Sequence, residues 1–164
     1  MKIYIAYTGG TIGMVPSDNG LVPDEAFAEQ LAQQLGASNE ITHDFVIQRY
    51  EHLIDSSNVT PKDWQTIASD IQSKWQAFDA FIVLHGTDTM AYTAAALSFM
   101  FAHSDKPIIV TGSQVPMYKV RSDAMINVMG AISACEASVY EKAVNGVFLF
   151  FAGRLIEGDR AHKA

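Results

Sequence analysis

Three short polar segments of the sequence carry hydroxyl groups, with glycines in two of them and carboxylates in two of them, and each follows an expected strand. They are residues 8–14, 55–58 and 85–90. Two adjacent glycines in the first segment let the backbone approach a ligand closely and present the hydroxyl of Thr11 to it. The same glycines would also form an ordinary tight turn, and both interpretations stay open at this point.

The third segment places Thr87 and Asp88 where an expected strand gives way to an expected helix. Both residue types are common as the N-cap of a helix. The N-terminus of a helix also binds anions, so capping and ligand binding are compatible. Capping alone does not explain why His85 and Gly86 precede them. Lys163, by its position alone, is a solvated side chain.

These segments do not fit the motifs of nucleotide binding, metal binding or serine hydrolysis. The glycines lack the G-x-G-x-x-G spacing, a proline-containing loop follows where a helix should begin, and there is no Walker lysine. There is no G-x-S-x-G elbow, and the five histidines have no metal-binding spacing. Cys135 lies in an apolar helical segment and is typical of a small core residue. We therefore expect neither a metal nor a cofactor.

The elements that must position these segments alternate between short apolar runs and longer stretches of helical period. The expected strands are 3–7, 45–50, 81–84, 107–110 and 147–151, and the expected helices are 27–35, 60–75, 90–100 and a segment from 123. The second helix has the clearest start, because Thr60 precedes Pro61 at the first helical position and Asp63 can complete an acidic capping box. A loop rich in proline, glycine and aspartate is expected at residues 15–23.

This order predicts an α/β fold, a three-layer αβα sandwich with a mostly parallel sheet and helices on both faces. In open sheets of this kind, ligands bind beyond the carboxyl ends of the strands. All three polar segments follow expected strands. They are therefore the first candidates for a functional site.

Composition limits the class of protein and its partners. The chain has 164 residues, a formal net charge of -7 and a single cysteine. This length fits one domain, and the acidic balance argues against nucleic acid and anionic membrane as partners. The apolar runs are much shorter than the roughly 20 residues of a membrane helix. One cysteine cannot form an internal disulfide, and the N-terminus has no signal-peptide pattern, so we expect a cytoplasmic protein.

Taken together, the motifs resemble the bacterial L-asparaginase family, in particular the cytoplasmic type I enzymes. The two threonine motifs of that family are similar to residues 8–13 and 85–90, in the same order. Further similar segments are residues 55–57, 111–114, 121–123 and 158–160. The resemblance implies that residues 1–164 form the N-terminal catalytic domain, that the family's C-terminal domain is absent, and that the protein is a homo-oligomer when that domain is present.

The same resemblance implies a hydrolase that converts L-asparagine to L-aspartate and ammonia through a covalent acyl-enzyme. Thr11 would be the nucleophile that attacks the side-chain amide carbon of the substrate. The linked triad beside it would be Thr87, Asp88 and Lys163, and the substrate-binding residues would be Asp55, Ser56, Ser57 and Gly86, the last near backbone donors for the oxyanion. A threonine hydroxyl needs an adjacent base, which a neutral lysine oriented by a carboxylate can supply.

One position departs from the family pattern. Leu21 stands where the family carries a tyrosine that assists the nucleophile, and leucine has no hydroxyl to relay a proton. Two alternatives to an asparaginase stay open. One, which Leu21 and the absent C-terminal domain favour, is a truncated, non-catalytic domain for amino-acid binding or assembly. The other is a subunit of a related tRNA-dependent amidotransferase, which shares both threonine motifs.

Overall fold

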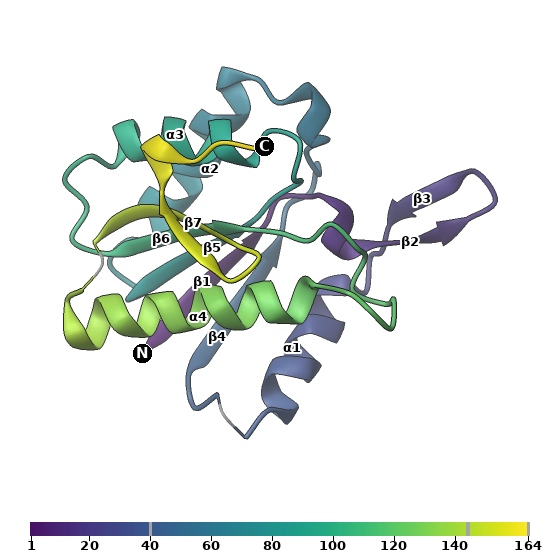
Figure 1. Cartoon of the computed structure of the whole chain (residues 1–164), viewed down its shortest axis with the longest axis horizontal. Helices are drawn as coiled ribbons and strands as arrows, with labels where there is room; N and C mark the ends of the chain where they lie inside the picture. Colours follow the sequence, from purple (N-terminus) through teal and green to yellow (C-terminus); the bar gives the residue numbers. More distant parts are fainter. Residues whose placement is uncertain (40, 144, 164) are drawn as a thin grey trace.

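The computed structural model describes residues 1–39, 41–143 and 145–163 and contains a six-stranded sheet at its centre (Figure 1). The strand order is β4-β1-β5-β6-β7-β8. The strands are β1 Lys2–Tyr7, β4 Asp44–Arg49, β5 Ala80–Leu84, β6 Pro107–Thr111, β7 Gly146–Phe151 and β8 Arg154–Glu157. The first five in this order are parallel, and only β8 runs antiparallel to its neighbour β7. The predicted fold class is therefore confirmed.

Helices cover both faces of the sheet, as the alternating pattern predicted. Helix α1 (Phe27–Ala37) and helix α4 (Ala124–Glu141) pack on one face, and helix α2 (Pro61–Lys74) and helix α3 (Met90–Met100) pack on the other. The side chains of β1 alternate between the two cores, so Ile5 joins the first and Tyr4 joins the second. Within the described residues, no helix is long and apolar enough to cross a bilayer.

The central strands are the least exposed part of the molecule. Every residue of β5 and β6 is buried. A strand that is covered on both faces reads as a continuous apolar run rather than an alternating one. This is why the short runs at 81–84 and 107–110 were recognisable as strands in the sequence.

Helix α2 begins where the sequence predicted it. Thr60 occupies the N-cap, Pro61 is the first helical residue, and the Asp63 carboxylate accepts hydrogen bonds from both the amide (2.8 Å) and the hydroxyl (2.7 Å) of Thr60. Proline has no backbone N–H to satisfy in the first turn, so it costs nothing there.

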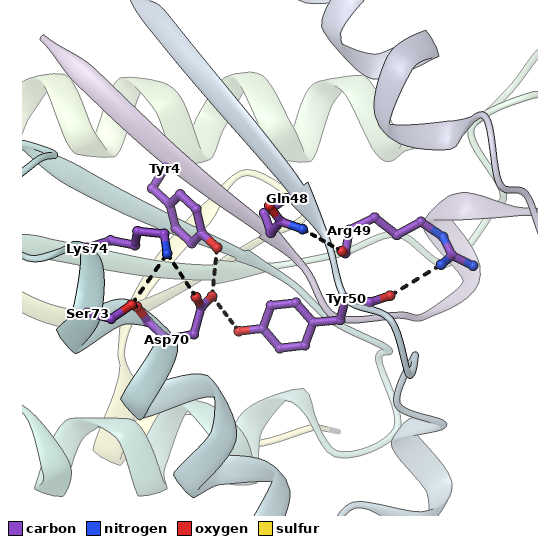
Figure 2. A network of polar contacts seen from close by, with 7 residues as sticks. All are labelled: Tyr4, Gln48, Arg49, Tyr50, Asp70, Ser73 and Lys74. Atoms are coloured by element: carbon purple, nitrogen blue, oxygen red, sulfur yellow. Dashed lines mark hydrogen bonds and ion pairs between the residues drawn. The ribbon is translucent and has the colours of Figure 1, made fainter.

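A carboxylate also fastens α2 to the sheet. The hydroxyls of Tyr4 on β1 and Tyr50 after β4 both donate to the same oxygen of Asp70, at 2.7 and 2.8 Å (Figure 2). The ammonium of Lys74, one turn along the helix, lies 3.9 Å from the other carboxylate oxygen. Burial, with the hydrogen bond to Asp70 as a second cause, raises the pKa of both tyrosines far above its usual value.

Three short strands were not predicted. The expected loop at 15–23 is instead a two-stranded hairpin, β2 (Met14–Ser17) and β3 (Gly20–Pro23), which projects from the body of the molecule (Figure 1). The antiparallel edge strand β8 was also missed. The hairpin contains two prolines, and its strands form a ribbon with no third neighbour, where proline is tolerated because the missing N–H has no ladder partner to lose.

Candidate active site

The strand order places a topological switch point between β1 and β5. After β1 the chain continues to β4 on one side of this point, and after β5 it continues to β6 and β7 on the other side. The carboxyl ends of the strands at such a point form a crevice that commonly binds ligands. The three polar segments follow β1, β4 and β5, which are neighbours in the sheet. The expected site therefore coincides with the switch point.

Glycines bring the three segments into direct contact. A methyl group at Gly10 would lie 2.5 Å from the amide nitrogen of Gly86, and a methyl group at Gly86 would overlap the hydroxyl of Ser56. Gly10 also has a φ of 94°, a conformation that favours glycine over other residues. Side chains at these two positions would push the segments apart. The paired glycines are therefore required by close packing and do not simply form a turn.

Thr11 begins a short 3-10 helix (Thr11–Gly13) immediately after this contact. The segment before it is anchored by Thr8, whose amide and hydroxyl both donate to the carbonyl of Leu84, at 3.1 and 2.8 Å. Thr11 is half-buried. In the described part of the chain its hydroxyl makes no hydrogen bond, so it is free to meet a ligand.

The other three residues of the predicted chemistry lie together. The ammonium of Lys163 is 3.3 Å from the carboxylate of Asp88, although the residues are 75 positions apart in the sequence. Thr87 and Lys163 line one cavity of about 310 Å³, together with Gln114 and apolar side chains of α3, β7 and β8. The Lys163 and Asp88 side chains are 50% and 61% exposed, so water screens their attraction.

Neither Thr87 nor Asp88 caps helix α3. The N-cap position belongs to Thr89, whose carbonyl accepts the first helical hydrogen bond from Thr93. The simplest alternative role for Thr87 and Asp88, helix capping, is therefore excluded. The side chains of Thr87 and Asp88 are therefore available for contacts outside helix α3, and that of Asp88 pairs with Lys163.

The segment after β4 presents an ionised carboxylate. Asp55 accepts hydrogen bonds from the amide and hydroxyl of Ser57 (3.0 and 2.8 Å) and from the side chain of Asn58 (2.9 Å). These bonds hold the pKa of Asp55 below its usual value. Ser56 is only 7% exposed and lies underneath, against Gly86. An exposed anion on a fixed turn is suited to bind a cationic group.

The structure adds a buried network that the sequence did not reveal. His85 Nδ1 lies 2.8 Å from the carbonyl oxygen of Gly86, and His85 Nε2 lies 3.0 Å from the hydroxyl of Thr93, which also accepts from the indole of Trp64. A carbonyl only accepts hydrogen bonds, so Nδ1 carries the proton and Nε2 accepts from Thr93. Burial lowers the pKa of His85. This neutral histidine fixes the peptide that leads into Thr87.

Leu21, at the expected position of the family tyrosine, lies on the projecting hairpin. It pairs with Pro16 across the ribbon and is 47% exposed. The place where we expected the family tyrosine is therefore occupied by an apolar, solvent-facing side chain in this structure.

Comparisons with known proteins give the family of the chain. A sequence model of the asparaginase family, described as "Asparaginase, N-terminal", matches residues 2–164. L-asparaginase 1 of Escherichia coli (strain K12) is 49% identical over 167 residues, which cover 99% of this chain and 47% of that protein. L-asparaginase I from Vibrio cholerae O1 biovar eltor matches in structure with a TM-score of 0.84 and 46% identity, covering 99% of this chain and 48% of that one.

A more distant structure shows the same fold. The thermostable L-asparaginase from Thermococcus kodakarensis gives a TM-score of 0.79 at 29% identity and covers 96% of this chain and 46% of that one. The chain thus spans about half the length of the relatives it matches. Since the family model covers nearly every residue, and an L-asparaginase and a solved L-asparaginase structure match over 99% of this chain, the chain belongs to the asparaginase family.

Proposed function

We propose that this chain is the N-terminal catalytic domain of an enzyme that hydrolyses L-asparagine to L-aspartate and ammonia. The observation that carries the proposal is the convergence of the three polar segments at one switch point. Thr11, Asp55 and Asp88 each come from one of three segments in mutual contact there, and the ammonium of Lys163 pairs with Asp88.

In the proposed reaction, Thr11 Oγ1 attacks the side-chain amide carbon of asparagine and forms a C–O bond. Its proton passes through the hydroxyl of Thr87 to Lys163, while the carboxylate of Asp88 orients the lysine. Collapse of the tetrahedral intermediate breaks the C–N bond, and the proton leaves with the nitrogen as ammonia. Water then attacks the acyl-enzyme, which releases L-aspartate and restores the Thr11 hydroxyl.

Substrate recognition is assigned to the segment after β4 and the backbone beside it. The Asp55 carboxylate would bind the α-ammonium group of the amino acid, with Ser56 and Ser57 in the same turn. Backbone amides near Gly86 would stabilise the oxyanion, an interaction typically worth about 10²–10³ in rate. Because His85 fixes the carbonyl of Gly86, these amides are held in one orientation before the substrate arrives.

For the whole protein we infer a C-terminal domain and a homo-oligomeric state. A lysine acts as a base only when it is neutral, and desolvation favours the neutral form. Lys163 and Asp88 are about half exposed here, so a further domain that covers them would supply that desolvation. The single cysteine, Cys135, is buried and free, which is consistent with a cytoplasmic location.

The test is ammonia release from L-asparagine by the purified chain, alone and with the C-terminal half of an asparaginase added in trans. We expect Thr11→Ala to abolish release and Thr87→Ala to reduce it about 10²–10⁴-fold, the usual worth of proton-transfer assistance. Thr66→Ala is the matched control, because the Thr66 hydroxyl bonds only its own helix at Lys62.

Two outcomes would contradict the proposal. Unchanged hydrolysis in the Thr87→Ala variant would remove Thr87 from the mechanism. Binding of L-aspartate by calorimetry without turnover, even with the second half present, would instead indicate a non-catalytic amino-acid-binding domain.

A further inference from the structure

We propose that Thr89 is a positioning residue, whose hydroxyl fixes the substrate-binding turn of residues 55–58 relative to the catalytic segment of residues 85–88. The inference rests on the proposed function. In this proposal Thr89 touches neither the substrate nor the reacting atoms. Its hydroxyl sets the position of the turn that carries the Asp55 carboxylate.

The first observation is that Thr89 stands at a capping position but does not cap. It is the N-cap of α3, where a threonine side-chain oxygen usually accepts a hydrogen bond from an amide in the first turn. Here the side chain makes no capping bond. Its hydroxyl instead donates to the carbonyl of Ser56, 33 residues earlier, at 2.6 Å. The hydroxyl therefore joins two segments rather than stabilising its own helix.

The second observation is that Ser56 is held from two sides. Its side chain fills the space above Gly86, and its carbonyl accepts from Thr89. Both contacts come from the segment after β5, one on each side of Thr87 and Asp88. Among the described residues, the Thr89–Ser56 bond is the one hydrogen bond that connects residues 55–58 with residues 85–90.

The remaining bonds of the turn fix its shape and leave its position to Thr89 and to packing. Asp55 accepts from Ser57 and Asn58, which lie within the same turn. Ile54 donates to the carbonyl of Thr8 at 2.7 Å, which anchors only the start of the turn, toward β1. Without the Thr89 hydroxyl, the turn would lose its hydrogen bond to the segment that carries Thr87, so it would shift against that segment and its internal bonds would open more often.

Such a shift predicts a kinetic effect of a particular kind. Asp55 would bind the α-ammonium group, which is remote from the amide carbon that reacts. Losing well-placed remote contacts weakens ground-state and transition-state binding alike, so KM rises while kcat changes little. A charge-assisted contact that is misplaced rather than removed predicts a KM increase of about 10-fold.

The experiment compares Thr89→Val, which keeps the shape and removes the hydroxyl, with Thr89→Ser, which keeps the hydroxyl. Both are measured in the active assembly used for ammonia release, with L-asparagine and with succinamate, the analogue that lacks the α-amino group. Thr66→Val, on the exposed side of α2, is the control for replacing a helical threonine hydroxyl. Thermal melts check that each variant folds.

We expect Thr89→Val to raise KM for L-asparagine about 10-fold with kcat within about twofold, and to raise KM for succinamate by a clearly smaller factor, because succinamate lacks the group that Asp55 would bind. Thr89→Ser should restore KM to within about twofold of the unmodified chain. Equal losses in both Thr89 variants, or equal losses with both substrates, would overturn the proposal, because a merely structural role does not distinguish the α-amino group.

A second readout separates this proposal from the proposed function. Amide hydrogen exchange at Ser57 and Asn58 reports the stability of the turn whether or not the protein turns over asparagine. Faster exchange in Thr89→Val, with unmodified rates in Thr89→Ser, supports the positioning role even if the protein proves inactive. Unchanged exchange in Thr89→Val would refute it even if the protein is an active asparaginase.

Discussion

His85 links protonation to the backbone that leads into Thr87 and Asp88. Its Nδ1–H is used by the carbonyl of Gly86, and its Nε2 lone pair is used by Thr93. A proton added to Nε2 would remove the acceptor that Thr93 uses and place a charge in the buried core. Burial accordingly lowers the pKa of His85 below its ordinary 6.5. The folded state therefore depends on a neutral histidine.

This dependence predicts a loss of stability in mild acid. Because the folded pKa is below the unfolded value of 6.5, the unfolded chain binds a proton first as pH falls, so stability is present above pH 6.5 and declines below it. One such site costs at most about 1.4 kcal/mol per pH unit in that range. Urea unfolding at pH 7.5 and 5.5 should show a larger loss in the unmodified chain than in His85→Gln, by up to about 1.4 kcal/mol. Equal losses in the two proteins would show that His85 does not titrate as proposed.

Individual site residues were predictable to different degrees. Position in the sequence indicated only a solvated role for Lys163, and the resemblance to the asparaginase family was needed to pair it with Asp88. The structure places the two charges 3.3 Å apart. The role of Thr89 had no signal in the sequence, because a threonine before a helix predicts a cap, and only tertiary contact shows that its hydroxyl goes elsewhere.

At the scale of elements, the 3-10 helix that carries Thr11 rests on strand β1 and helix α1. A side chain at Gly13 would overlap the hydroxyl of Tyr7 and lie 2.5 Å from its Cζ. The ring of Tyr7 packs against Phe27 of α1, with centroids 4.4 Å apart. The Tyr7 hydroxyl is buried and has no hydrogen-bond partner among the described residues. Its contact with Gly13 is therefore one of shape alone.

That contact predicts the effect of a single methyl group. Gly13→Ala should destabilise the chain by about 1–3 kcal/mol, because the new Cβ overpacks against Tyr7. Tyr7→Phe removes one of the overlapping atoms and loses no hydrogen bond, so the double variant should recover part of the loss, measured as a coupling energy in a double-mutant cycle. Gly36→Ala is the control, since Gly36 lies in α1 with open space around it, and it should be neutral or stabilise by up to about 1 kcal/mol. Strict additivity of the two substitutions would rule out the contact.

Elements with a strong apolar pattern were the predictable ones. The strands at the centre of the sheet and helices α1 to α4 all lie where the sequence placed them, because their buried faces require apolar residues at a fixed period. The hairpin β2–β3 and the edge strand β8 are short and mostly exposed. Backbone hydrogen bonds hold such strands together without requiring a particular pattern of apolar residues. Prolines and glycines in the hairpin pointed to a loop.

At the scale of the whole molecule, the two outer layers are attached to the sheet in different ways. Helices α1 and α4 join it through an apolar core that includes Leu31 and Val128. Helix α2 adds a polar connection, since Asp70 accepts from tyrosines that belong to two neighbouring strand segments (Figure 2). Lys74 belongs to the same helix and contributes only a partly exposed pair at 3.9 Å. Most of the polar attachment should therefore come from the two phenol hydrogen bonds.

A graded series of substitutions tests this attachment. Asp70→Ala leaves the buried phenol hydroxyl of Tyr4 and the partly buried one of Tyr50 without an acceptor and should lower the free energy of unfolding by about 2–4 kcal/mol. Asp70→Asn keeps a single oxygen that can accept from both Tyr4 and Tyr50, because both bonds go to one atom, and should cost about 1 kcal/mol through loss of charge. Lys74→Ala should cost at most about 1 kcal/mol, the usual value for a solvated ion pair. Urea unfolding gives all three values. A Lys74→Ala loss as large as that of Asp70→Ala would mean that the ion pair, and not the tyrosines, holds the α2 layer to the sheet.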